Sequence, residues 1–171
     1  MQPEFREVAP ELLTDNVIHL IAEEWMLVTA GPPDAFNTMT ASWGGLGNLW
    51  GLPVSFVFVR PSRYTFEFMN RAAQFTLSFF PEAYHDALMY CGTHSGRDVD
   101  KMAETGLTPV VGAHDTVHFA EARLVLECRK LYAQDFERDG FVDHAVRQKV
   151  YGSATDFHRF YVGHITRCLT R

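Results

Sequence analysis

The stretch from Pro53 to Pro61, PVSFVFVRP, constrains the fold more than any other part of the sequence. Its apolar residues follow one another almost without interruption, and a proline stands at each end. A short run of this kind is typical of a strand that is covered on both faces. The segment QFTLSFF, residues 74–80, has the same character. The chain is therefore expected to build a sheet with a large covered area.

More strands are predicted on either side of these two runs. EWMLVTAG ends in a Gly-Pro-Pro turn, and NTMTASWGG is extended, rich in threonine and stopped by glycines. These patterns predict strands at Glu24–Gly31 and Asn37–Gly45, and RFYVGHITRCL predicts a late strand at Arg159–Leu169. Apolar residues alternate between Val117 and Cys128, which predicts one long strand with a single covered face.

Three short helices are predicted between the strands. Ser62 can cap the first, the second follows Pro81 and ends at Gly92, and the third begins near Arg97–Asp98 and stops at Gly106. Asp98 is the expected cap of the third helix. Its buried side is expected to consist of Val99, Met102 and Ala103. Many strands, few helices and no regular alternation favour a mainly β fold, a β-barrel with short peripheral helices, over a doubly wound sheet.

Size and charge narrow the classes of function. The 171 residues suit a single domain over 1–171, and a formal net charge of −6 without a basic stripe argues against nucleic-acid binding. The N-terminus does not resemble a signal peptide, and no stretch is apolar enough to span a membrane. The cysteines are odd in number and widely spaced, which suits a reducing compartment. A cytoplasmic location is expected.

The segment CGTHSGRDVDKM, from Cys91 to Met102, indicates a local anion site against the overall charge. Ser95 can donate its hydroxyl, and Gly96 permits close backbone approach. Arg97 and Lys101 stand four residues apart, so on a helix both would reach one phosphate from the same face. The alternative is an exposed turn with a ladder of salt bridges.

Two other segments suit the remainder of a phosphorylated ring compound. NTMTASWGGLGNLWG, residues 37–51, alternates small polar residues with larger ones and presents an extended backbone edge to a flat ring. RPSRYTFEF, residues 60–68, adds two arginines at the junction of a strand and a helix. A flavin mononucleotide requires such an edge, an aromatic wall and a cationic pocket. Trp50 is expected in the core, whereas Trp43 fits the core and the ring site equally well.

The segments MTASWGG, RPSRYT and SGRDVDK, followed by ETGLTP, closely resemble the flavin reductase-like family and in particular its flavoredoxin-type members. The resemblance runs from about Asn37 to Tyr132 and implies a Greek-key FMN-binding split barrel that forms a homodimer. It also implies that Met39–Trp43 line the flavin ring, Arg60–Thr65 contact the ribityl chain and phosphate, and Ser95–Lys101 complete the phosphate site. The candidate cofactor-binding residues are Asn37, Met39, Thr40, Ala41, Ser42, Trp43, Arg60, Ser62, Arg63, Tyr64, Thr65, Ser95, Gly96, Arg97 and Lys101.

The expected function is an FMN-binding oxidoreductase that passes electrons through the bound flavin; FAD is a second candidate cofactor. GGLGNLWG does not have the spacing of a dinucleotide-binding loop, so NAD(P)H is expected to dock only transiently. The main alternative is a non-catalytic flavin-binding protein for storage or sensing, and a third is oxidation of a pyridoxal-type amine on the same barrel. No catalytic residue is assigned. No metal site is expected at His114 and His118, and Cys91 is expected to be a small core residue.

Overall fold

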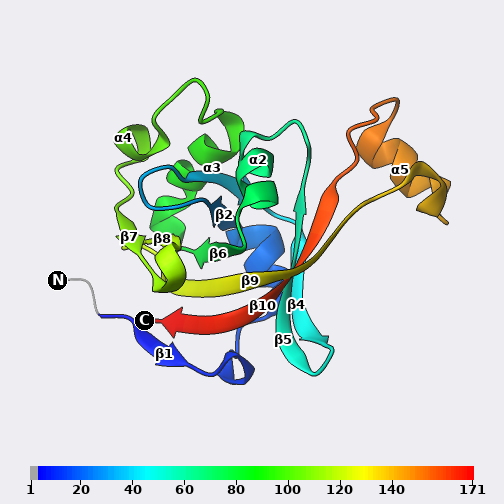
Figure 1. Cartoon of the computed structure of the whole chain (residues 1–171). Helices are drawn as coiled ribbons and strands as arrows, with labels where there is room; N and C mark the ends of the chain where they lie inside the picture. Colours follow the sequence, from blue (N-terminus) through cyan, green and yellow to red (C-terminus); the bar gives the residue numbers. More distant parts are fainter. Residues whose placement is uncertain (1–3) are drawn as a thin grey trace.

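The computed structural model describes residues 4–171 and is dominated by one large antiparallel sheet (Figure 1). The strands follow the order β3-β2-β6-β9-β10-β5-β4, and β1 pairs with the C-terminal end of β10. A small second sheet contains β7 and β8. The strand bounds are β1 Arg6–Val8, β2 Met26–Ala30, β3 Asn37–Ala41, β4 Gly44–Leu49, β5 Leu52–Val59, β6 Gln74–Phe79, β7 Pro109–Val111, β8 Val117–Phe119, β9 Leu124–Asp135 and β10 Arg159–Thr170.

The large sheet curls into a barrel that is open along one seam. β3 and β4 stand at opposite ends of the strand order, yet only Ser42 and Trp43 separate them in the chain. So short a connection requires the two ends of the sheet to approach each other. At the start of β4, a side chain on Gly44 would contact Met26 of β2. The mainly β barrel with short peripheral helices is therefore confirmed.

The helices are short and lie outside the barrel (Figure 1). Their bounds are α1 Val17–His19, which continues into a π-helical turn at Leu20–Glu24, α2 Tyr64–Arg71, α3 His85–Thr93, α4 Lys101–Thr105 and α5 His144–Tyr151. Single 3₁₀ turns occur at Pro10–Leu12, Glu82–Tyr84, Ala113–Asp115 and Arg138–Gly140.

The start of α4 was predicted wrongly. The helix begins at Lys101 and is capped by Asp100, whose carboxylate accepts the N–H groups of Met102 and Ala103. Asp98 lies upstream in a turn closed by its N–H bond to the Ser95 carbonyl. Lys101 is the buried residue of α4, whereas Ala103 is exposed and Val99 and Met102 are half-buried. The end at Gly106 is confirmed, with φ of +69°.

The starts and ends of two other helices also differ from the sequence prediction. Ser62 does not cap α2, because its hydroxyl donates to Asp156 and the N-cap residue is Arg63. α3 continues past Gly92 to Thr93. The long strand expected from Val117 to Cys128 is two strands, since the chain turns after Phe119 and re-enters the large sheet as β9 at Leu124.

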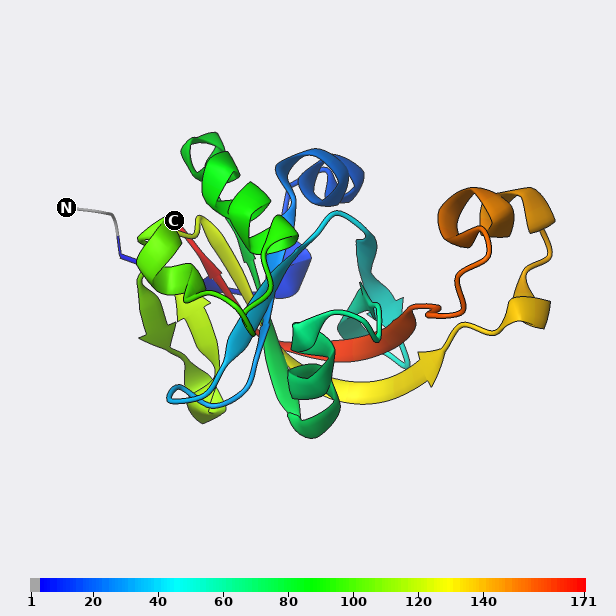
Figure 2. The same ribbon diagram turned by 90° about the horizontal axis from the view of Figure 1, so that it is seen from above.

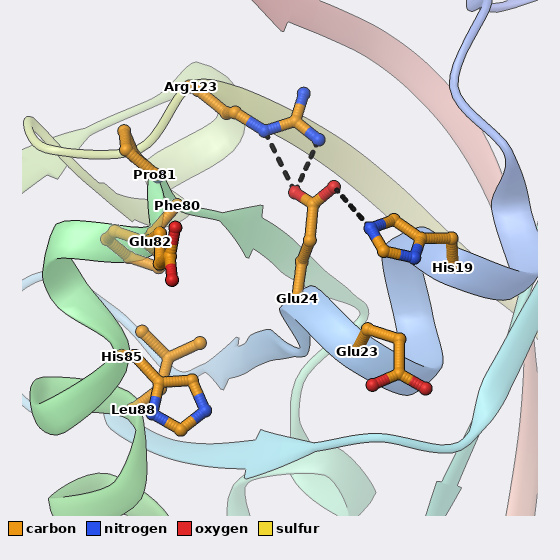
Figure 3. A pocket seen from close by; sticks show the side chains of 9 residues that line it. All are labelled: His19, Glu23, Glu24, Phe80, Pro81, Glu82, His85, Leu88 and Arg123. Atoms are coloured by element: carbon orange, nitrogen blue, oxygen red, sulfur yellow. Dashed lines mark hydrogen bonds and ion pairs between the residues drawn. The ribbon is translucent and has the colours of Figure 1, made fainter.

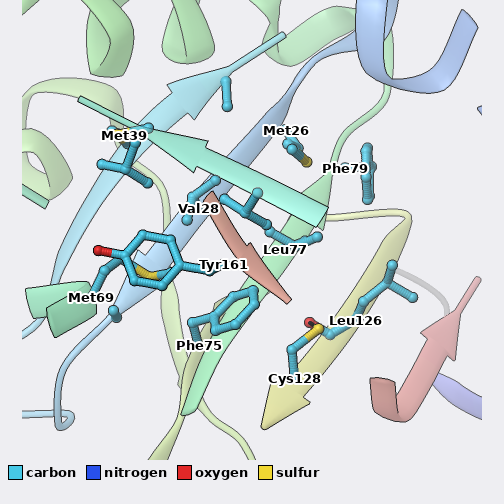
Figure 4. Packing of buried hydrophobic residues seen from close by; sticks show 14 of the residues in the cluster. Met26, Val28, Met39, Met69, Phe75, Leu77, Phe79, Leu126, Cys128 and Tyr161 are labelled. Atoms are coloured by element: carbon cyan, nitrogen blue, oxygen red, sulfur yellow. Dashed lines mark hydrogen bonds between the residues drawn. The ribbon is translucent and has the colours of Figure 1, made fainter. Parts of the chain in front are cut away.

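The main core fills the barrel between β2, β6, β9 and β10 (Figure 4). A second apolar cluster on the outer face joins Leu27 of β2 and Val125 of β9 to α3. β6 is therefore covered on both faces, as predicted. β5 is not, because Val57 and Val59 are buried while Phe56 and Phe58 on the alternate face are half-exposed.

The burial predicted for single residues is only partly confirmed. Trp50 is wrongly predicted as a core residue, since it lies in the β4–β5 turn with 62% of its surface exposed. Trp43 is also outside the core, at 51% exposure. Cys91 is fully buried, as expected.

β9 and β10 extend beyond the barrel and carry a projecting segment, residues 136–158, called the arm below (Figure 2). It contains α5 and a chain of ring contacts that includes Phe136, Phe141, Tyr151 and Phe157. Tyr151 is the buried residue of α5, whereas Val142 is 98% exposed. The arm is thus attached to the barrel mainly at its base.

Candidate functional site

The three segments singled out in the sequence meet around one pocket of about 180 Å³. It lies between the start of β3, the loop that leads into α2, and the turn between α3 and α4. Its lining residues are Asn37, Met39, Ser62, Arg63, Tyr64, Thr65, Gly92, Thr93, His94, Ser95, Gly96 and Lys101. Nine of these are among the fifteen candidate residues. We call this the cationic pocket.

Lys101 places a buried ammonium group in the wall of the cationic pocket. Its side chain is folded back so that Nζ donates to the carbonyl of Thr38 at 2.7 Å and to that of Cys91 at 2.8 Å. The pKa of Lys101 is lowered to about 8, mainly by burial; Cys91 opposes this effect, and the nearby Arg63 adds to it. The ammonium ion is therefore only partly compensated by its surroundings, and a nearby anion would stabilise it.

Arg63 supplies a second cation to the same pocket. Its Nη1 donates to the carbonyl of Gly92 at 2.9 Å, and burial lowers the pKa of the guanidinium. Both Gly92 and Cys91 belong to the last turn of α3, where helix carbonyls lack intrahelical partners. The negative end of α3 thus holds the two cations in place, and both can face a group with two negative charges.

Gly96 keeps the pocket open. A Cβ atom there would collide with Oδ1 of Asn37 and crowd the ring of Tyr64. Asn37 is itself fixed, because its Nδ2 donates to Oγ1 of Thr65 at 2.8 Å. The hydroxyl of Ser95 accepts the N–H of Arg97 at 3.2 Å. Glycine is therefore required at 96 by space, and the cradle formed there suits a small anion such as phosphate.

Six candidate residues do not line the cationic pocket. Thr40 donates its hydroxyl to the carbonyl of Leu88, and Ala41 is buried in the main core. Ser42 and Trp43 line a separate apolar groove with Ile18, Leu46 and Phe58. The remaining two are Arg60 and Arg97.

Both of these arginines are held by carboxylates. Arg60 lies 3.9 Å from Asp156, and Arg97 is paired with Glu67 while its guanidinium lies 4.5 Å from the centre of the Tyr64 ring. Arg97 and Lys101 do not share a helix face, since α4 begins only at Lys101. The prediction that they share one helix face is therefore wrong, whereas a contact of Arg97 with phosphate stays a prediction.

Sequence reasoning missed the contribution of Gly92, Thr93 and His94. The ring of His94 stacks on Tyr90 at 3.9 Å between centroids, and its Nδ1 lies 3.1 Å from Oγ1 of Thr93. These residues form the end of α3 and the residue after it. The preference of cations for the C-terminal end of a helix is the signal that indicates this region.

A larger cavity, of about 740 Å³, lies near the N-terminal end of α3 (Figure 3). Among the described residues that line it, none is a candidate for flavin binding. Its Arg123 is paired with Glu24 and Asp15, and Glu23 and Glu82 add further negative charge. A phosphate would be repelled here, so the cationic pocket remains the candidate site.

Residues 4–171 show neither a metal-binding cluster nor a membrane-spanning helix. No group of three or more His, Cys, Asp or Glu side chains there is arranged to hold a metal ion. None of the helices in this part of the chain is long and apolar enough to cross a membrane.

The fold is the FMN-binding split β-barrel. The chain belongs to the family of the flavin reductase like domain, whose model matches residues 18–171. This membership supports a flavin-related redox role. No curated protein sequence matches the chain.

Solved structures show the same fold at low sequence identity. An FMN-binding protein from Thermus thermophilus with bound 1-cyclohex-2-enone is 22% identical, with a TM-score of 0.68 over 99% of this chain and 80% of that one. A flavoredoxin from Methanosarcina acetivorans is 22% identical, with a TM-score of 0.69 over 95% and 76% of the two chains. An NADH:FAD oxidoreductase from Streptomyces globisporus is 17% identical, with a TM-score of 0.64 over 85% of this chain and 74% of that one.

Proposed function

We propose that the protein is an FMN-binding oxidoreductase of the flavin reductase or flavoredoxin type, and that the cationic pocket holds the FMN phosphate. The main observation behind the proposal is that two cations, Arg63 and Lys101, line the same pocket although the chain has a net charge of −6. A phosphate monoester carries close to two negative charges at neutral pH, which these two cations match. The space next to Gly96 fits the same group.

The pocket is too small for a whole flavin. At about 180 Å³ it suits a phosphate and part of the ribityl chain, whereas sites for entire ligands usually exceed about 300 Å³. We place the ring along β3, from Met39 towards Trp43, because β3 ends the strand order of the described sheet and its outer side lacks a strand partner there. The bound isoalloxazine would supply the redox chemistry, and this chain would orient it and fix its phosphate.

NAD(P)H is the proposed electron donor, docking transiently over the ring. The structural similarity to an NADH:FAD oxidoreductase supports a nicotinamide donor and keeps FAD as a second candidate cofactor. The similarity to a protein described only as FMN-binding supports the alternative, a flavin-binding protein without turnover. The two functions differ in whether reduced nicotinamide is consumed.

We also propose that residues 1–171 act as one domain that forms a homodimer. The exposed apolar side chains of Tyr132, Val142 and Val146, on or beside the arm, support a second copy as the partner. Sedimentation velocity is expected to give twice the mass of the chain, and a monomer at micromolar concentration would contradict this. The cysteines are all free, which supports the cytoplasm as the location.

The central experiment measures flavin binding and reduction. Purified protein loaded with FMN is expected to be yellow and to be bleached anaerobically by NADH or NADPH. Protein that binds FMN but is reduced by neither donor supports either a flavoredoxin-type carrier that another protein reduces or the storage alternative. Protein that takes up neither FMN nor FAD rejects the proposal.

Lys101→Met tests where the phosphate lies. We expect FMN affinity to fall by about tenfold or more while riboflavin affinity changes little, because the variant removes a charge-assisted contact to the phosphate. Lys130→Met is the matched control, since Lys130 likewise donates to backbone carbonyls, at Met69 and Asn70, away from the pocket. Equal losses for both flavins in Lys101→Met would move the phosphate elsewhere.

A further inference from the structure

Two candidate phosphate contacts, Arg60 and Ser62, are already engaged by the arm. Oγ of Ser62 donates to Oδ2 of Asp156 at 3.0 Å, and Nη1 of Arg60 lies 3.9 Å from Oδ1 of the same carboxylate. Nη2 of Arg60 also donates to the carbonyl of Val150 at 3.2 Å, and its guanidinium lies 5.1 Å from the centre of the Tyr151 ring. The base of the arm is therefore attached to the loop that leads into α2.

The loop that contacts the arm also forms part of the cationic pocket. Ser62 lines the pocket, and the next residue, Arg63, is one of its two cations. Asp156 is half-buried, with 33% of its side chain exposed, so it is close enough to water to exchange partners. The loop from Arg60 to Arg63 thus carries the arm on one side and the proposed phosphate on the other.

A carboxylate and a phosphate compete for the same donors. Hydroxyl and guanidinium groups form charge-assisted hydrogen bonds with either anion, and two anions on one short loop repel each other. Asp156 therefore occupies the hydroxyl donor of Ser62 and forms an ion pair with Arg60, two groups that the phosphate of a flavin would otherwise use.

We propose that Asp156 is a positioning residue that withholds Arg60 and Ser62 from the flavin phosphate, so that the phosphate is bound by Arg63 and Lys101 and its binding opposes the attachment of the arm. The proposal rests on the proposed function, since it assumes that the pocket takes a phosphorylated flavin. According to this proposal, the arm controls how much more tightly the protein binds FMN than riboflavin.

The deciding variant is Asp156→Asn. The amide oxygen can still accept the hydroxyl of Ser62, whereas the ion pair with Arg60 and the repulsion of phosphate are lost. We expect FMN affinity to rise about three- to fivefold, the range that a partly exposed ion pair accounts for, with riboflavin affinity unchanged. Asp139→Asn, an exposed carboxylate on the same arm, is the matched control and should leave both affinities unchanged.

Fluorescence titration of the flavin-free proteins with FMN and with riboflavin measures the ratio of the two affinities. The same ratio in wild type and Asp156→Asn would overturn the proposal, as would weaker FMN binding, which would mean that Asp156 only supports the loop. Wild-type protein that binds neither flavin would instead reject the proposed function, and this inference with it.

Hydrogen exchange of the wild-type protein provides a second test that does not depend on the folding of a variant. Exchange in residues 150–158 is expected to increase when FMN binds and to stay constant when riboflavin binds, because only FMN brings the second anion to the loop. Unchanged or slower exchange with FMN would contradict the opposition between phosphate and arm.

Discussion

Lys101 holds a positive charge in a place that is poorly suited to charge. Only 6% of its surface is exposed, and its ammonium group donates to the carbonyls of Thr38 and Cys91. Carbonyl dipoles at the end of α3 offset part of the cost of burying the ammonium ion, and the remainder lowers its pKa to about 8. An anion beside Lys101 would raise this pKa again. Binding and protonation are therefore coupled.

This coupling predicts how the preference for FMN over riboflavin depends on pH. Above pH 8 Lys101 in the free protein loses its proton, so the preference is expected to fall by up to tenfold per unit. Below about pH 6 the phosphate itself gains a proton and loses charge, so the preference falls again. Affinities measured from pH 5 to pH 10 should therefore show a maximum between these limits.

Lys101→Met provides the control for the alkaline side of that profile. Its preference for FMN should be weak and constant above pH 8, while the decrease below about pH 6 remains because it belongs to the phosphate. A decline of the same size above pH 8 in this variant would show that another group titrates there.

At the level of elements, the sequence predicts the strands better than the ends of the helices. The apolar run of β6 sets its position almost to the residue, because burial on both faces requires such a run. The start of α4 is different, since Asp98 and Asp100 are both good caps and local sequence does not choose between them. The observed start at Lys101 lets its side chain reach two distant carbonyls. That choice depends on tertiary contacts.

Asp100→Ala tests the role of this cap. Loss of its bonds to the N–H groups of Met102 and Ala103 is expected to destabilise the protein by about 1 kcal/mol. FMN binding should also weaken, because the first residue of the helix is Lys101. Denaturant unfolding and flavin titration measure the two effects.

Asp98→Ala is the matched control for that experiment, because it removes an exposed carboxylate two residues upstream. It should change the free energy of unfolding by less than about 0.5 kcal/mol. A larger loss in Asp98→Ala than in Asp100→Ala would place the effective cap at Asp98.

In the whole molecule, the cationic pocket exists because the barrel brings β3, the loop before α2 and the end of α3 together. The sequence indicates the first two segments and the turn after α3, since their small and cationic residues are conspicuous. It does not reveal that the carbonyls at the end of α3 hold Lys101 and Arg63. Nor does it reveal the arm, because a segment rich in aromatic residues such as Phe141 and Phe157 resembles a segment of the buried core. Trp50 is wrongly predicted as a core residue for the same reason, since its aromatic side chain is typical of a core.

Gly163 lies at a point of the barrel where one added carbon atom would overlap core side chains. It stands in β10 between Ser55 of β5 and Lys130 of β9, at a register shift. A Cβ atom there would overlap the ring of Phe75 in the main core and approach Cβ of Cys128. A strand paired on both sides has little freedom to move away, so the added methyl group strains the core.

Gly163→Ala is therefore expected to lower the free energy of unfolding by about 1–3 kcal/mol, the usual cost of overpacking. Phe75→Leu in the same chain should recover part of the loss by making room, which an effect on the backbone of Gly163 alone would not allow. Gly140→Ala, where a Cβ meets no atom within 4 Å, is the control. Because Gly163 lies outside the cationic pocket, the ratio of FMN to riboflavin affinity should stay constant while stability falls. A change in that ratio would mean that strain in β10 reaches the arm and, through Asp156, the phosphate site.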